Sequence, residues 1–184
     1  MLCGGRVALF YEHLPSRPRV YLFGGGHVGQ ALVRHLKDLD FHVTMIDSRT
    51  GIESAGLEVN RLLIADYDRA LSDEHVPEGG FFVIATHSHR FDYALLRRIL
   101  TAGWKPRYVG MVASKKKAAG FLQDLKAELG ADVDADLPAL YMPIGLDTGG
   151  RSAAEIAVSI AAEIQAVRYG RSGLPHLRLE ALQP

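Results

Sequence analysis

The chain has 184 residues and carries 21 Lys and Arg against 21 Asp and Glu, so its formal net charge is zero. Nucleic-acid binders and polybasic membrane clamps carry an excess of positive charge, and this balance argues against both. With 48% hydrophobic and 23% charged residues, the composition is typical of a folded domain with a core. The longest stretch without a charged residue, 20–33, is too short to cross a bilayer, and a single cysteine permits no internal disulfide. We therefore expect a cytoplasmic protein that binds neither nucleic acid nor membrane.

Short β-branched and aromatic runs alternate with longer segments of helical period, which predicts βαβ units with a parallel sheet. The predicted strands are residues 19–23, 42–46, 61–64, 81–85 and 108–112. Helices are expected after Gly29, after residue 89, from Ser114 to Gly130 and from Ser152 to about Val167, with an acidic loop at 132–138. The predicted fold is a doubly wound, mainly parallel Rossmann-like α/β sheet in three α/β/α layers, with strand order 3-2-1-4-5.

Three parts are expected along the chain. Residues 1–18 form an N-terminal segment with a short strand, residues 19–167 the Rossmann-like domain, and residues 168–184 a C-terminal tail. The last helix is rich in Ala and Ile, and together with the tail it offers a surface for pairing. We therefore predict a homodimer.

A glycine-rich loop follows the first strand and fits the pattern G-x-G-x-x-G. It consists of Gly24, Gly25, Gly26, His27, Val28 and Gly29. Gly24 allows a tight turn, Gly26 lets backbone N–H groups approach a pyrophosphate, and Gly29 lets helix and strand pack closely. The loop predicts nucleotide-type binding, with His27 either meeting a phosphate or pointing to solvent. The alternative is a turn that keeps its glycines only for packing.

Asp47 ends the second strand 18 residues after Gly29, where an acid can accept hydrogen bonds from a ribose. Ser48 and Arg49 follow it, and Arg49 is a candidate for reading a 2′-phosphate. Because the acid is present, NAD is favoured over NADP as a nucleotide ligand.

Three lysines, 115–117, lie in the first turn of the helix that Ser114 caps, where the helix dipole disfavours cations. An anion held there by Ser114 and Lys115 would explain the cluster. The alternative is a solvated run of charges, which we favour for the other two lysines.

Thr86, His87 and His89 follow the fourth strand, and Asp92 comes shortly after. In the predicted strand order, strands one and four are neighbours, so this loop faces the same crevice as Gly26. His87 and His89 are candidates for cofactor contact and for acid–base catalysis. Together with Asp92 they are also candidate metal ligands, although a catalytic zinc site needs a third ligand that the sequence does not identify. The remaining alternative is a pair of hydrogen-bonded loop histidines.

Six motifs, taken in order, resemble the xanthine dehydrogenase accessory (XdhC/CoxI) family and its C-terminal Rossmann domain. They are CGG at 3–5, FGGGHVGQAL at 23–32, MIDSR at 45–49, IATHSHRFDYALL at 84–96, YVGMVASKKKAAGF at 108–121, and PIGLDTGGRSAAEIAVSIAAEI at 143–164. Cys3 matches the cysteine of the family's CGG motif, and a thiol is a candidate ligand for a soft molybdenum centre. Most of the family's N-terminal domain is expected to be missing, as in a short relative, a fragment or a protein split over two chains.

The resemblance implies an accessory or chaperone role in the maturation of molybdenum hydroxylases. The chain would bind the molybdenum cofactor, as molybdopterin or its dinucleotide, and promote its sulfuration by a partner such as a cysteine desulfurase. It would then pass the cofactor to an apoenzyme such as xanthine dehydrogenase. The sequence leaves three alternatives: an NAD(P)-dependent oxidoreductase using His87 or His89, a metal-dependent hydrolase using both histidines with Asp92, and a nucleotide-sensing module.

Overall fold

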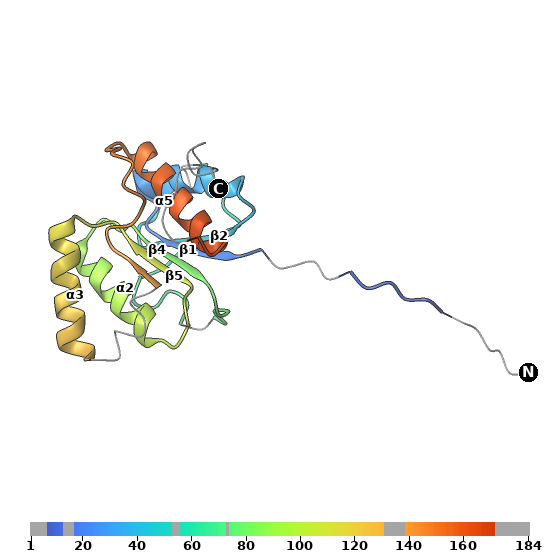
Figure 1. The fold of residues 1–184 in the computed structure, drawn as a ribbon, viewed down its shortest axis with the longest axis horizontal. Coiled ribbons are helices and arrows are strands. Elements are labelled where there is room, and N and C mark those ends of the chain that lie inside the picture. Colours follow the sequence, from blue (N-terminus) through green and yellow to red (C-terminus); the bar gives the residue numbers. More distant parts are fainter. Residues whose placement is uncertain (1–6, 13–16, 53–55, 73, 131–138, 172–184) are drawn as a thin grey trace, which may run out of the picture.

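A computed structural model describes residues 7–12, 17–52, 56–72, 74–130 and 139–171 (Figure 1). Within these ranges six strands, all parallel, form one sheet in the order β3-β2-β1-β4-β5-β6. The strands are β1 (Arg19–Phe23), β2 (His42–Asp47), β3 (Arg61–Ile64), β4 (Phe81–Ile84), β5 (Tyr108–Met111) and β6 (Leu140–Tyr141). The four inner strands β2, β1, β4 and β5 are almost wholly buried, because a parallel sheet is covered on both faces.

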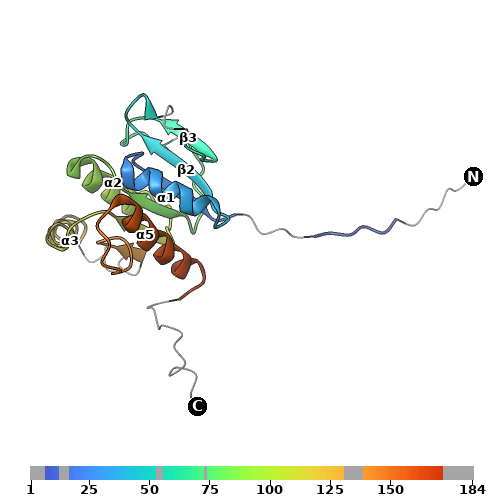
Figure 2. The ribbon, with the colours of Figure 1, turned by 90° about the horizontal axis from the view of Figure 1, so that it is seen from above.

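In the described part of the chain, four helices cover the sheet: α1 (His27–Lys37), α2 (His89–Thr101), α3 (Lys115–Leu129) and α5 (Ala153–Arg168). Figure 2 shows α1 and α5 next to each other, and their apolar side chains share one core with Val20 and Leu22 of β1. Alternate residues of the same strand, Tyr21 and Phe23, belong to a second core that α2 and α3 cover. The period-two alternation of β1 therefore separates two cores, and the predicted three-layer α/β/α fold is confirmed.

The five predicted strands and their order are confirmed, with ends that differ by at most one residue. The sixth strand, β6, was not predicted, since two residues are too short to show a period. Between β3 and β4 the described residues form turns rather than a helix. Tyr67, Leu71 and Val76 of this connection nevertheless pack into the second core.

Some predictions concern residues that the structure does not describe. These are Cys3, the acidic loop at 132–138 and most of the C-terminal tail. Residues 7–12 and 17–18 form neither helix nor strand, so the short strand expected within 1–18 is not found in the described part of that segment. Across the described residues, no helix combines the length and the apolar character that crossing a membrane requires.

Helix α5 uses its apolar face inside its own chain. Ala157, Ile160 and Ile164 are completely buried in the core shared with α1. At the end of the helix, Arg168 Nη1 donates a hydrogen bond to the Leu39 carbonyl oxygen (2.6 Å). The Ala/Ile surface on which the homodimer prediction rested is thus occupied by α1. This face therefore gives no basis for pairing, and the homodimer itself stays an untested prediction.

Candidate functional site

Three strand ends meet around the glycine loop. The Gly24 amide donates to the Ile46 carbonyl oxygen of β2 (2.8 Å), and the Ala85 amide donates to the Phe23 carbonyl oxygen of β1 (2.8 Å). Gly24 has a φ of +111°, which favours glycine, and a Cβ at this position would overlap the Ala85 carbonyl group. The loops that follow β1, β2 and β4 are therefore joined at the carboxyl edge of the sheet, where ligands bind in open α/β folds.

The other two motif glycines differ in their surroundings. A Cβ at Gly29 would overlap the Gly24 carbonyl oxygen, so this glycine allows the close approach of helix and loop. A Cβ at Gly26 would meet no atom within 4 Å. Gly26 is also the N-cap of α1, and no side chain caps that helix end. The first N–H groups of a helix have no partner within the helix, so this open position is suited to an anion.

The Asp47 carboxylate is hydrogen-bonded to neighbouring residues of the same site. Its side chain has no exposed surface. Its Oδ1 accepts hydrogen bonds from the Arg49 amide and Nε (2.9 Å each), and its Oδ2 accepts from the Gly25 amide (2.7 Å) and Arg49 Nη2 (2.8 Å). Burial alone would raise the pKa of Asp47, but the hydrogen bonds from Arg49 and Gly25 outweigh it and lower that pKa.

The geometry gives Asp47 a structural task. The carboxylate fixes the glycine loop and holds the Arg49 guanidinium beside it, and all four acceptor positions are filled. A ribose hydroxyl would have to displace Arg49 to reach it. The predicted contact between Asp47 and a sugar therefore stays a prediction that requires Arg49 to move.

The loop after β4 is tied down by a second buried acid, Asp92, which is 3% exposed. Its Oδ1 accepts hydrogen bonds from the Thr86 hydroxyl (2.6 Å) and amide (3.2 Å). Its Oδ2 lies 3.4 Å from His89 Nδ1, and His89 Nε2 contacts Lys117 Nζ at the start of α3. Burial raises the pKa of Asp92. Thr86, Asp92, His89 and Lys117 thus link β4, α2 and α3.

His87 and His89 make contacts with different parts of the structure. His89 joins the chain of contacts to α3, whereas the His87 ring packs edge-on against Phe91 (centroids 5.5 Å apart). Among the described residues, no group of three or more His, Cys, Asp or Glu side chains is arranged to hold a metal ion. The described geometry gives no support to a metal site made of His87, His89 and Asp92.

Ser114 is the N-cap of α3, as predicted, and its Oγ accepts a hydrogen bond from the Lys117 amide (3.3 Å). Lys115 lines a hollow of about 420 Å³, as does Leu140 of β6. In the sheet order, two strands, β4 and β5, separate β6 from β1 and its glycine loop. The anion site predicted at Ser114 and Lys115 is not tested by these contacts.

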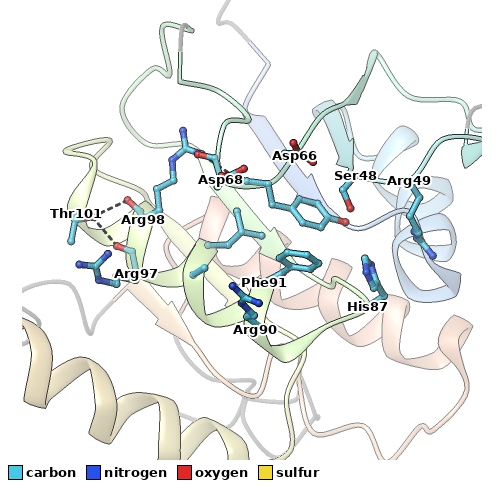
Figure 3. A pocket seen from close by; sticks show the side chains of 13 residues that line it. Ser48, Arg49, Asp66, Asp68, His87, Arg90, Phe91, Arg97, Arg98 and Thr101 are labelled. Carbon is cyan, nitrogen blue, oxygen red and sulfur yellow. Dashed lines mark hydrogen bonds between the residues drawn. The ribbon is translucent and has the colours of Figure 1, made fainter.

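A larger pocket, of about 760 Å³, lies between α2 and the loops that follow β2 and β3 (Figure 3). Ser48, Arg49 and His87 line it, so it brings together three of the predicted site residues. Tyr67 and Phe91 also line it, and neither was predicted from the sequence as a site residue. Their signal was present but ambiguous, because an aromatic residue after a strand or in an apolar helix stripe is typical of the core.

The fold and the glycine loop define the class: this is a Rossmann-type domain with the G-x-G-x-x-G loop of dinucleotide-binding proteins. Residues 20–164 match the family model described as the XdhC Rossmann domain, and the chain belongs to this family. The resemblance seen in the sequence motifs is confirmed.

The chain is also similar to individual proteins. The chain is 29% identical, over 93% of its length, to the uncharacterized protein YqeB of Escherichia coli. It is 25% identical, over 85% of its length, to a probable xanthine dehydrogenase subunit from Bacillus subtilis. A crystal structure of a xanthine dehydrogenase from Bacillus halodurans has the same fold, with a TM-score of 0.70 and 23% identity over 88% of this chain. The matches span 31%, 44% and 45% of these three proteins, so the chain corresponds to less than half of each.

Proposed function

We propose that this domain belongs to an accessory protein for a molybdenum hydroxylase of the xanthine dehydrogenase type. In this proposal it binds the molybdenum cofactor, as molybdopterin or its dinucleotide, at the glycine loop, and a hydroxylase apoenzyme is the recipient. Family membership and the name of the Bacillus subtilis relative support the accessory role. The observation that carries the binding proposal is the open space above Gly26 at an uncapped helix start.

The residues around the loop are compatible with a phosphate-bearing cofactor. The backbone N–H groups at the start of α1 would hold a phosphate or pyrophosphate above Gly26. The Arg49 side chain, which is 42% exposed, has surface left for a second anionic or hydroxyl group. When bound, the cofactor supplies the molybdenum centre that the recipient enzyme needs, and the domain contributes binding and orientation. A sulfurtransferase partner, such as a cysteine desulfurase, is part of the same proposal.

The substitution Gly26→Val tests the loop. Its side chain would project into open space, so we expect the free energy of unfolding to stay within about 1 kcal/mol of wild type. The same side chain would occupy the phosphate position, and affinity for the cofactor should fall at least about tenfold. Urea unfolding measures the free energy of unfolding, and anaerobic equilibrium binding of the molybdopterin cofactor measures the affinity.

Gly120→Ala is the matched control, since Gly120 is exposed on α3 and a Cβ there would also meet nothing within 4 Å. It should bind cofactor as the wild type does. NAD and NADP are titrated in parallel. Tight binding of either, with no binding of the cofactor, would overturn the proposal in favour of an NAD(P)-dependent oxidoreductase.

A further inference from the structure

The hollow that Lys115 lines is a groove of about 420 Å³ at one edge of the sheet, between β6 and α3. Among the described residues β6 pairs only with β5, so its outer edge carries backbone groups that no other strand binds. Lys115 is exposed and has no hydrogen-bond or ion-pair partner in the described part of the chain. The apolar side chains that line the groove include Ala118, Ala119 and Leu122 of α3, Leu140 of β6 and Met142 after it.

Residues 7–12, which we name the arm, have features complementary to this groove. Val7, Leu9, Phe10 and Tyr11 are 71–91% exposed, and the arm extends away from its own sheet (Figure 1). Glu12 ends the arm, and it is exposed and unpaired among the described residues. The arm forms neither helix nor strand, although valine, phenylalanine and tyrosine favour strands. It therefore has the composition of a strand that lacks a neighbouring strand.

An additional parallel strand beside β6 would bring the arm into register with α3. Helix α3 follows β5 and runs back along the sheet, so Lys115 lies at the carboxyl ends of the strands and Leu122 about two turns further along. On one face of such a strand, Ala8, Phe10 and Glu12 repeat about every 6.6 Å, close to the helical repeat of about 5.4 Å. The facing positions are Ala8 with Leu122, Phe10 with Ala118 and Ala119, and Glu12 with Lys115.

This register matches both size and charge. A small side chain of the arm faces the leucine, the large Phe10 ring faces two alanines, and the Glu12 carboxylate faces the free ammonium group of Lys115. In the opposite direction Glu12 would lie against Leu122, and the ion pair would be lost. The parallel direction is therefore favoured, and it is also the direction of every other strand in the sheet.

The arm of the same chain is too short to reach this position. β1 and β6 are three strand spacings apart, about 14 Å, and Glu12 would lie at the opposite end of the strands from Arg19, about 16 Å away. Because helices cover both faces of the sheet, the chain would have to follow both legs, about 30 Å. From residue 12 to residue 19 a fully extended chain spans at most about 24 Å.

We propose that the groove holds the arm of a second copy of this chain, and that two copies exchange arms in a symmetric dimer. The two arm–groove contacts are equivalent, so the assembly closes at two copies. A six-residue arm is small beside the roughly 20–30 residues that each partner contributes to a standard interface. The association is therefore weak, and the dilute chain is a monomer with its arm exposed.

Sedimentation velocity of the full chain from about 5 to about 500 μM tests this exchange, and the mass should rise from monomer toward dimer over this range. Phe10→Ala removes the side chain that fills the groove, so the dissociation constant should rise at least about tenfold. Leu9→Ala trims the opposite face of the same strand and should raise the dissociation constant less than about threefold. Val158→Ala is the matched control at an exposed apolar position of α5, and it should associate as the wild type does.

Charge reversal tests whether the arm of one copy lies in the groove of the other. Glu12→Lys and Lys115→Glu each bring like charges together, so each variant alone should associate at least about fivefold more weakly than wild type. An equimolar mixture of the two variants has opposite charges at both arm–groove contacts, and it should dimerise within about twofold of wild type. Lys116→Glu is the matched control, since this exposed lysine does not line the groove, and its dissociation constant should also stay within about twofold.

Three results would overturn the proposal. The first is a wild-type chain that stays monomeric up to about 500 μM. The second is a mixture of the charge variants that associates no better than either variant alone, because the arm then does not enter the groove of the other copy. The third is wild-type association of Phe10→Ala, which would place the contact on another surface. None of these measurements involves the cofactor, so this inference and the proposed function are tested separately.

Discussion

Two buried carboxylates near the candidate site have pKa values that are shifted in opposite directions. Asp47 receives four hydrogen bonds, two of them from a guanidinium, and its pKa is lowered. Asp92 receives two hydrogen bonds from Thr86 and has a histidine 3.4 Å away, and its pKa is raised. The number and charge of the hydrogen-bond donors, and not burial alone, therefore decide in which direction the pKa of a buried carboxylate is shifted.

Asp47→Asn tests this balance at neutral pH. The amide keeps a similar shape but loses the charge-assisted bonds to Arg49, and we expect a loss of about 2 kcal/mol in the free energy of unfolding. Arg49 is partly exposed, so solvent screening limits how much its ion pair with Asp47 contributes to the free energy of unfolding. Urea unfolding of both proteins at pH 7 measures the difference.

The effect should also depend on pH. A folded-state pKa below the unfolded value of about 3.9 stabilises the protein above that value, and this stabilisation is lost as the pH falls through the folded pKa. The difference in the free energy of unfolding between wild type and Asp47→Asn should therefore stay constant from pH 7 to pH 5 and become smaller below about pH 4. A gap that stays constant down to pH 3 would contradict the lowered pKa.

At the scale of elements, a buried hydrogen bond ties the sheet to its last helix. The hydroxyl of Tyr108 on β5 donates to Glu163 Oε1 of α5 (2.6 Å), and the same oxygen accepts from the Gly145 amide (2.9 Å). Tyr108 is completely buried and Glu163 is 9% exposed. This carboxylate therefore positions both α5 and the loop that precedes it.

Tyr108→Phe removes one donor and leaves a buried carboxylate with a single amide partner. We expect the free energy of unfolding to fall by about 1–3 kcal/mol, as for other buried groups that lose their partner. Tyr93→Phe is the matched control, since Tyr93 also donates to a glutamate, Glu128 (3.1 Å), but at an exposed position. The control should change stability by about 0.5 kcal/mol or less, and equal effects of the two substitutions would contradict a special role for the buried bond.

The elements were largely predictable from the sequence, whereas the pocket was not. The strands are largely apolar runs, and clear signals such as Gly24 after β1 and Asp47 at the end of β2 mark where they stop, so their positions and order follow from local pattern. The pocket depends on the connection between β3 and β4, which carries no regular period. Its aromatic wall joins Tyr67 to Phe91 across 24 positions, and only the tertiary fold brings these rings together.

At the scale of the whole molecule, residues 7–12 are a described segment that takes no part in the core of the domain. Residues 7–12 extend away from the sheet in Figures 1 and 2. Val7, Leu9, Phe10 and Tyr11 are 71–91% exposed. A contiguous apolar surface of this kind is unusual on a folded domain and marks a segment suited to contact with another protein surface. The core of the domain begins at β1, after this segment.

Deletion of residues 7–12 should therefore leave the domain folded. Since no buried contact of residues 7–12 is lost, we expect the melting temperature to stay within about 2 °C of wild type. Binding of a hydrophobic dye should decrease, because four exposed apolar side chains are removed. Calorimetry and dye fluorescence measure the two effects on the same samples. A fall of more than about 5 °C would show that the segment stabilises the domain, and unchanged dye binding would show that its apolar side chains are covered in solution.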